Sequence, residues 1–129
     1  MTERWIVDAM NVIGSRPDGW WKDRTGAIVR LVDRLERWAP TQHRAVTVVL
    51  ERPMSPPIRS SVVEIAHAPR AAANSADDEI VRLVEADCAP QQLTVVTSDG
   101  ALSERVRGAG ASVFPAASFR NLIDRAHER

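Results

Sequence analysis

The sequence has almost no cysteine and no excess of charge of either sign. Its single cysteine, Cys88, excludes a disulfide within the chain and is typical of a protein from the reducing cytoplasm. Because the three histidines are scattered along the chain, we expect no structural zinc site. The 17 basic and 17 acidic side chains balance, which excludes a generally basic nucleic-acid binder of the histone type but allows a local basic patch.

Long apolar runs are also missing. No stretch approaches the ~20 apolar residues of a membrane span. Residues 1–10 (MTERWIVDAM) begin with charged side chains and hold only a short apolar run, so we expect no signal peptide and no membrane contact. With 129 residues, of which 44% are apolar, the chain is long enough for one domain with one core. We predict a single cytoplasmic domain over residues 1–129.

The charges that balance overall are unevenly distributed. Residues 1–60 carry ten basic and seven acidic side chains, a net charge of +3, and residues 61–129 carry seven and ten, a net charge of −3. Sixteen of the basic side chains are arginine, whose planar fork suits phosphate, although a genome-wide base bias gives the same count.

Short apolar runs alternate with helical patterns along the chain. We predict strands at residues 5–7, 45–50, 62–66, 93–97 and 111–114. Apolar spacing predicts helices at residues 28–38, closed by Pro40, and at 75–88, 100–108 and 119–126, whereas residues 11–26 are expected to form a loop. Because the strands are continuous apolar runs, we predict an α/β fold, a three-layer α/β/α sandwich with a mainly parallel five-stranded sheet.

Acidic residues follow several of these strands. Asp8 ends the first, Glu51 the second and Asp99 the fourth, while Asp77 and Asp78 open the helix before the fourth. The carboxyl ends of parallel strands share one edge of the sheet, where sites form. Carboxylates brought together repel each other, and a divalent cation, Mg²⁺ or Mn²⁺ for oxygen-only ligands, removes that cost. The implied chemistry is hydrolysis of a phosphodiester or phosphate ester.

Most of these acids also have a purely structural interpretation. Asp99, Asp77 and Asp78 suit the first turn of a helix, and Glu51 suits a solvated strand end. Asp8 is the hardest to explain in this way, because a carboxylate directly after a buried strand is costly unless it is paired or ligated.

Three short motifs resemble those of a known family in order and spacing. Residues 8–13 (DAMNVI) resemble the opening D-x-x-N-(V/I)-I motif of NYN domains, a branch of the PIN-like nuclease superfamily. Residues 75–80 (SADDEI) resemble their (T/S)-A-D-x-x-I helix start, and residues 97–99 (TSD) their T-S-D strand end. The resemblance spans nearly the whole chain and is closest to the YacP-like group.

The resemblance implies a metal-dependent endoribonuclease on a PIN-like fold. Its metal-binding acids match Asp8, Asp77 and Asp99, and its polar site residues match Asn11 and Ser98. Asp78 is a candidate additional ligand. Glu51 stands where YacP-like members often end the strand in a Phe-Asp pair, so it can keep the carboxylate on a longer arm.

The loop at residues 11–26 offers groups that suit single-stranded or looped RNA. Basic groups track the backbone and aromatic rings stack on bases. Adjacent tryptophans more often anchor a loop, with one ring buried and the other exposed. The candidate RNA-binding residues are Arg16, Trp20, Trp21, Lys22, Arg24 and, from the next loop, Arg52.

Two other functions compete with the endoribonuclease. A small-molecule phosphohydrolase commonly uses a strand-end D-x-D, but here the sequence is Asp8-Ala9-Met10, which lacks the second acid. A PIN-like module that binds RNA or protein without catalysis is compatible with the zero net charge. The sequence leaves open the oligomeric state and the need for a partner such as a ribosome or an RNA-processing complex.

Overall fold

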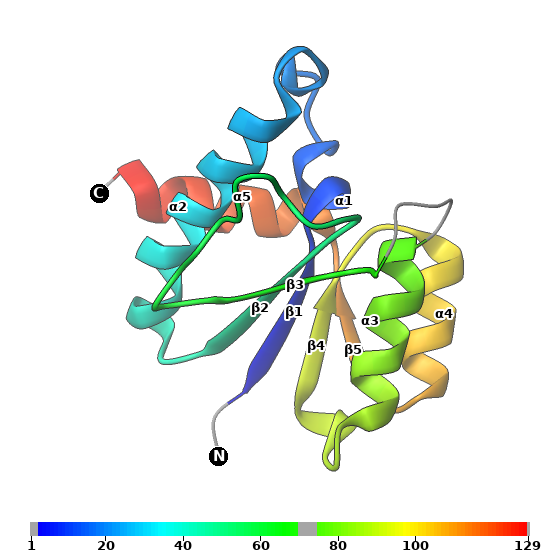
Figure 1. Ribbon diagram of the computed structural model, residues 1–129. Helices are drawn as coiled ribbons and strands as arrows, with labels where there is room; N and C mark the ends of the chain where they lie inside the picture. The colour runs from blue at the N-terminus through cyan, green and yellow to red at the C-terminus, as the bar shows by residue number, and fades with distance from the viewer. Residues whose placement is uncertain (1–2, 70–74, 129) are drawn as a thin grey trace.

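The computed structural model describes residues 3–69 and 75–128, which form alternating strands and helices (Figure 1). The strands within these ranges are β1 (Arg4–Asp8), β2 (Ala45–Leu50), β3 (Glu64–His67), β4 (Leu93–Val96) and β5 (Ser112–Phe114). The α-helices are α1 (Ala9–Ile13), α2 (Arg24–Gln42), α3 (Ser75–Ala86), α4 (Gly100–Gly108) and α5 (Ala116–Glu128). Short 3-10 turns occur at Trp20–Lys22 and Pro90–Gln92. None of the helices in this part of the chain is both long enough and apolar enough to span a membrane.

The five strands form one sheet in the order β3-β2-β1-β4-β5, and every pair in it is parallel. β1 lies at the centre and is flanked by β2 on one side and β4 on the other. The strand order therefore reverses next to β1, at the switch point where open parallel sheets form their sites.

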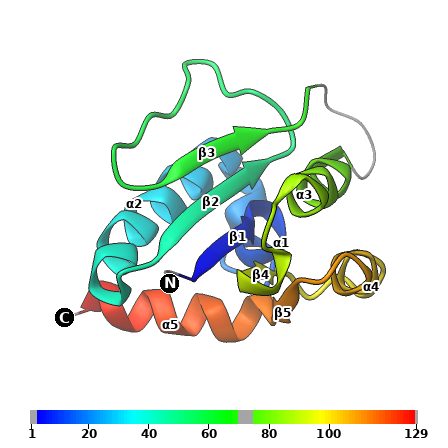
Figure 2. The ribbon, with the colours of Figure 1, turned by 90° about the horizontal axis from the view of Figure 1, so that it is seen from below.

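Helices cover both faces of the sheet, which confirms the predicted three layers. Trp5 and Val7 of β1 pack in the cluster that includes α1, α2 and α5, whereas Ile6 packs in the cluster that includes α3 and α4. Seen along the strands in Figure 2, α2 and α5 lie on one side of the sheet and α3 and α4 on the other. Because side chains alternate along a strand, Asp8 belongs to the same face as Ile6, the face of α3 and α4.

Several predicted boundaries are wrong, among them the start of the third strand and the end of the first predicted helix. The third strand begins at Glu64 rather than residue 62, because the Ser60 hydroxyl accepts hydrogen bonds from the backbone N–H groups of Val62 and Val63 and holds them in a turn. The second helix continues through Pro40 to Gln42. The proline lies in the last turn, and its carbonyl still accepts a hydrogen bond from His43, which ends the helix with φ of 52°.

The segment predicted as a loop at residues 11–26 is partly helical. The chain turns directly from β1 into α1, so Asn11 lies in a helix. α2 begins four residues earlier than predicted, because the Asp23 carboxylate accepts a hydrogen bond from the N–H of Gly26 at 3.0 Å and caps its first turn.

A candidate acidic site at the carboxyl edge of the sheet

Asp8 is a buried carboxylate at the end of the central strand. Only 6% of its surface is exposed. The pKa of Asp8 is raised to about 6. Burial is the largest cause and the negative charges of Asp77 and Asp99 add to it, whereas hydrogen bonds from Thr97 and the backbone of Asn11 act in the opposite direction. The ionised form is therefore held at a cost in free energy that its hydrogen bonds offset only in part.

Asp77 and Asp99 belong to the same electrostatic group. Asp77 lies in the first turn of α3, and its pKa is raised by burial and by the charge of Asp99, while Arg105 lowers it. Asp99 is the N-cap of α4, where its Oδ1 accepts a hydrogen bond from the N–H of Leu102 at 2.8 Å. Three carboxylates from β1, α3 and the end of β4 thus act on one another at the switch point.

Thr97 connects two of the acids. It was not among the site residues predicted from the sequence. This residue is only 1% exposed, its hydroxyl donates to Asp8 Oδ2 at 3.1 Å, and the same oxygen accepts from the N–H of Asp99 at 3.1 Å. The signal available in the sequence was its place as the first residue of the TSD motif.

Asn11 and Ser98 hold the elements around the acids together. The side-chain oxygen of Asn11 accepts a hydrogen bond from the N–H of Ser98 at 2.8 Å, which joins α1 to the segment after β4. The Ser98 hydroxyl accepts from the N–H of Ala116 at 2.9 Å, in the first turn of α5. Both residues lie at the carboxyl edge of the sheet, where their hydrogen bonds fix the segment after β4 against α1 and α5.

The acids do not form a ready-made metal cage. Across residues 3–69 and 75–128, no group of three or more histidine, cysteine, aspartate or glutamate side chains is arranged to hold a metal ion. Asp78 is exposed and accepts a hydrogen bond from Arg105 at 3.0 Å. Glu51, also exposed, lines a hollow on the β2 side of the edge.

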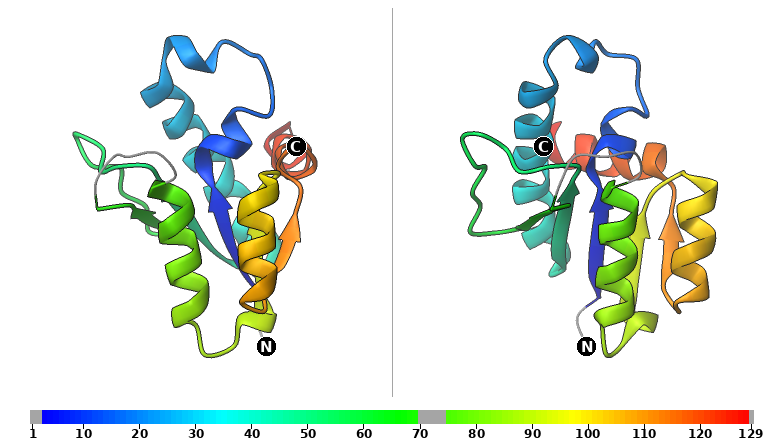
Figure 3. Two further views of the ribbon diagram at one scale, coloured as in Figure 1. Left: turned by 90° about the vertical axis from the view of Figure 1, so that its right-hand side faces the viewer. Right: turned by 45° about the vertical axis from the view of Figure 1, so that its right-hand side comes forward.

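The loop between α1 and α2 rises beyond the edge where β1 and β4 end (Figure 3). Trp20 is half-buried and packs edge-on against Trp21, which is 52% exposed. One ring therefore packs against the core while the other is exposed, the arrangement of an anchored loop. Lys22 and Arg24 are exposed, and the Arg24 guanidinium lies over the Trp20 ring at 5.3 Å from its centroid.

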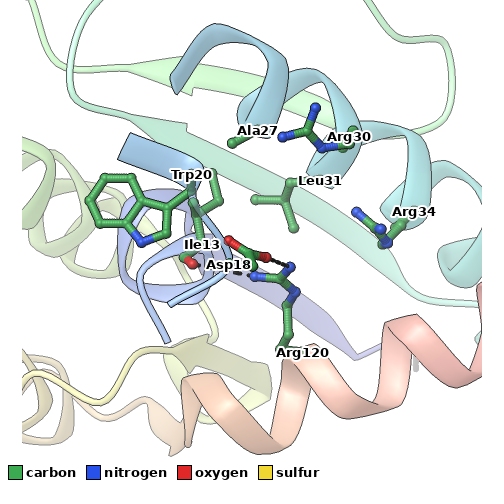
Figure 4. A pocket seen from close by; sticks show the side chains of 8 residues that line it. All are labelled: Ile13, Asp18, Trp20, Ala27, Arg30, Leu31, Arg34 and Arg120. Atoms are coloured by element: carbon green, nitrogen blue, oxygen red, sulfur yellow. Dashed lines mark hydrogen bonds and ion pairs between the residues drawn. The ribbon is translucent and has the colours of Figure 1, made fainter. Parts of the chain in front are cut away.

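Arg16, the remaining basic residue predicted in this loop, is tied down by α5. Its guanidinium forms an ion pair with Asp124 and a hydrogen bond with Asn121. Nearby, Arg120 donates to Asp18 at 2.7 Å and to the carbonyl of Ile13 at 3.3 Å. Figure 4 shows Arg120 reaching Asp18 beside a small cavity that Arg30 and Arg34 of α2 also line. We call Arg16, Arg34, Arg120, Asp18 and Asp124 the arginine network.

Comparisons with known proteins agree with this architecture. The family model of the YacP-like NYN domain matches residues 5–129. The crystal structure of Rae1 (YacP) from Bacillus subtilis superposes with a TM-score of 0.79 at 23% identity, covering 99% of this chain and 77% of that chain. A tryptophan-to-leucine mutant of Rae1 gives a TM-score of 0.80 at 22% identity over 99% and 79%. No curated protein matches the chain.

The solved structures establish the fold, and the family model establishes the kinship. The match leaves out only the first four residues, and it includes all three motifs that carry the resemblance in the sequence. The chain therefore belongs to the YacP-like NYN family of nuclease-like domains.

Proposed function

We propose that the chain is a metal-dependent ribonuclease that hydrolyses phosphodiester bonds of RNA at the acidic edge. The observation that carries this proposal is the state of Asp8, a carboxylate 6% exposed whose pKa is raised to about 6 by burial and by Asp77 and Asp99. Perturbed carboxylates gathered at a switch point are typical of catalytic sites, and a bound cation would remove the repulsion among them.

The donors suit Mg²⁺ or Mn²⁺ held by a few carboxylates and by water, rather than an ion enclosed entirely by protein ligands. Asp8, Asp77 and Asp99 would hold it, whereas Asp78 pairs with Arg105 and Glu51 faces the hollow. Mg²⁺ commonly takes one or two carboxylates and completes its shell with water and substrate phosphate, so a preformed group of three ligands is not required. When bound, the cation polarises the phosphate and lowers the pKa of a water molecule.

The chain itself positions these acids. Thr97 orients Asp8 by donating to one carboxylate oxygen, and through its bond to the N–H of Asp99 it sets the start of α4. Asn11 fixes the segment after β4 from the opposite side. These hydrogen bonds would hold the Asp8 and Asp99 carboxylates at a fixed separation while RNA binds.

RNA would approach over the exposed groups around the edge. Lys22, Arg24 and Arg52 supply positive charge for the phosphates, and Trp21 offers a ring face for an unpaired base. Because these groups are local, they are compatible with a chain of zero net charge. The expected substrate is a single-stranded or looped region of RNA in the cytoplasm.

Cleavage of labelled RNA with Mg²⁺, Mn²⁺ or EDTA tests the proposal. We expect the wild type to cleave with either metal and to lose activity in EDTA. Asp8→Asn should lose about a hundredfold or more, since metal activation contributes several kcal/mol. Asp33→Asn, which removes an exposed acid on α2, is the matched control and should cleave like the wild type.

Cleavage that survives both EDTA and Asp8→Asn would contradict the proposal. A wild type that binds RNA but does not cleave it would favour the alternative, an RNA-binding module without catalysis. One observation favours that alternative, namely that the described residues contain no preformed group of three metal ligands.

A further inference from the structure

A hollow lies beside the acidic edge, on the β2 side. It is a shallow depression that opens to solvent. Residues from α1, from the start of α2 and from the segment after β2 line it, among them Met10, Thr25 and Met54. The loop conformation that creates this hollow was not visible in the sequence.

The hollow has an apolar floor. Leu50 and Ile28 are buried members of the core, and the half-buried side chains of Met10 and Met54 pack against the same core. Methionine side chains are flexible and polarisable, so they adapt to a flat ring better than branched side chains do. The floor therefore suits a planar, uncharged group.

Charged side chains stand among the residues that line the hollow. Arg24 and Arg52 contribute two positive charges, and Glu51 contributes one negative charge. A phosphate placed on the apolar floor would lose its hydration and meet the Glu51 carboxylate, which costs free energy. The same phosphate bound at an arginine instead keeps its hydration and gains an opposite charge.

The position of the hollow relates it to the acids. Met10 follows Asp8 by two residues, and Leu50 ends β2, whose Val49 pairs with Asp8 in the parallel register. The hollow therefore lies at the same edge of the sheet as the acids, but on the face of α1 and α2. An RNA strand that crosses this edge can contact both.

We propose that this hollow is a subsite for one unpaired nucleobase of single-stranded RNA, with the flanking phosphates at Arg24 and Arg52. The inference rests on the proposed ribonuclease function and names the part of the substrate that binds next to the acids. Double-stranded RNA does not fit, because its bases are stacked and paired and cannot enter the hollow singly.

The methionines allow a direct test in solution. The chain has three methionines, and two of them line the hollow, so a protein labelled with ¹³C at the methionine methyls has few signals. We would titrate it in EDTA with a single-stranded hexaribonucleotide. Ring-current shifts are expected for Met10 and Met54, and a duplex of the same sequence should leave both methyl signals in place.

Filling the hollow provides the second measurement. Thr25→Trp places a ring at an exposed position on the rim, so it should fold normally, and it should weaken binding of the hexaribonucleotide about tenfold, equivalent to ~1.4 kcal/mol. Val29→Trp adds the same ring one turn later on α2, at an exposed residue outside the hollow, and should bind like the wild type.

The outcomes separate the subsite from the nuclease. Unshifted Met10 and Met54 signals, or equal affinities for Thr25→Trp and Val29→Trp, would overturn the subsite even if the wild type cleaves RNA with Mg²⁺. Conversely, Met10 and Met54 shifts that are reduced by Thr25→Trp, in a protein that cleaves no RNA, would support the subsite and contradict the nuclease function.

Discussion

The acidic edge and the arginine network both gather charged side chains, but in opposite ways. At the edge, Asp8, Asp77 and Asp99 carry like charges, and the pKa values of Asp8 and Asp77 are raised by burial and by the neighbouring negative charges. In the network, arginines alternate with acids, and the pairs include Arg120 with Asp18 at 2.7 Å and Arg34 with Asp124 at 3.1 Å.

The difference separates a binding function from a structural one. Paired charges satisfy each other, so the network needs no ligand and joins the loop after α1 to α2 and α5. Among the described residues, Asp8, Asp77 and Asp99 form no ion pair, and they store a repulsion that an added cation would relieve. Neutralising a charge should therefore have opposite effects on stability in the two regions.

The largest expected effect is a gain in stability from Asp8→Asn in EDTA at pH 7.5. The pKa of Asp8 is about 6 in the folded protein and 3.8 for an ordinary aspartate, so ionisation opposes folding. At 1.36 kcal/mol per pKa unit, the cost is about 3 kcal/mol. Asparagine removes it and can still accept the Thr97 hydrogen bond. Urea unfolding should show the increase, with Asp33→Asn unchanged.

The pH dependence of stability provides an independent test of the sign of this effect. Between pH 3.8 and about 6 the folded state holds a proton on Asp8 that the unfolded state releases. The destabilisation caused by ionised Asp8 therefore shrinks as the pH falls through 6 and is absent below about 4. The advantage of Asp8→Asn should shrink over that window. A variant less stable than the wild type at pH 7.5 would contradict the repulsion at the edge.

The second effect, a loss of stability, is expected from Arg120→Met. The variant keeps the aliphatic packing but removes the hydrogen bonds to Asp18 and the Ile13 carbonyl and the 3.6 Å ion pair with Asp124. Hydrogen bonds to charged groups contribute about 1.5–3 kcal/mol, so we expect a loss of about 2 kcal/mol in urea unfolding.

Arg125→Met is the matched control for this loss. Arg125 lies on the same helix, is exposed, and bonds only weakly within α5, to the carbonyl of Asn121 at 3.4 Å. An Arg120→Met protein as stable as Arg125→Met would mean that the network does not hold the loop.

The contrast between the regions also explains what the sequence could predict. Asp8 stood out because a carboxylate directly after an apolar run is costly, a local signal that needs no tertiary information. The parallel order of the strands then brought Asp77 and Asp99 to the same edge. Arg16, in contrast, was expected to contact RNA, and its pairing with Asp124, 108 residues away, depends on how α5 packs.

Other features depended on tertiary packing in the same way. Thr97 resembles any strand residue until its hydroxyl is placed between Asp8 and the N–H of Asp99. The hollow at Met10 and Met54 depends on the path of the segment after β2, which contains three prolines and carries no periodic pattern. Periodicity predicts elements, whereas such contacts between distant segments follow only from the packed structure.

Arg105 provides the smallest expected effect on stability together with an effect on RNA binding, because it is a cation at the acidic edge. Its ion pair with Asp78 is exposed on both sides, so Arg105→Gln should change the unfolding free energy by less than about 0.5 kcal/mol. A phosphate can replace Asp78 as its partner. We therefore expect RNA binding in EDTA to weaken and the slope of log affinity against log salt to fall by about 1.

Arg107→Gln tests whether that effect belongs to the edge or to net charge alone. Both arginines lie on α4 and are exposed, but Arg105 is the one that pairs with Asp78 and lowers the pKa of Asp77. Equal losses of affinity would indicate a diffuse field. A loss confined to Arg105→Gln would place the RNA backbone at the acids, because of these two arginines it is Arg105 that pairs with Asp78 there.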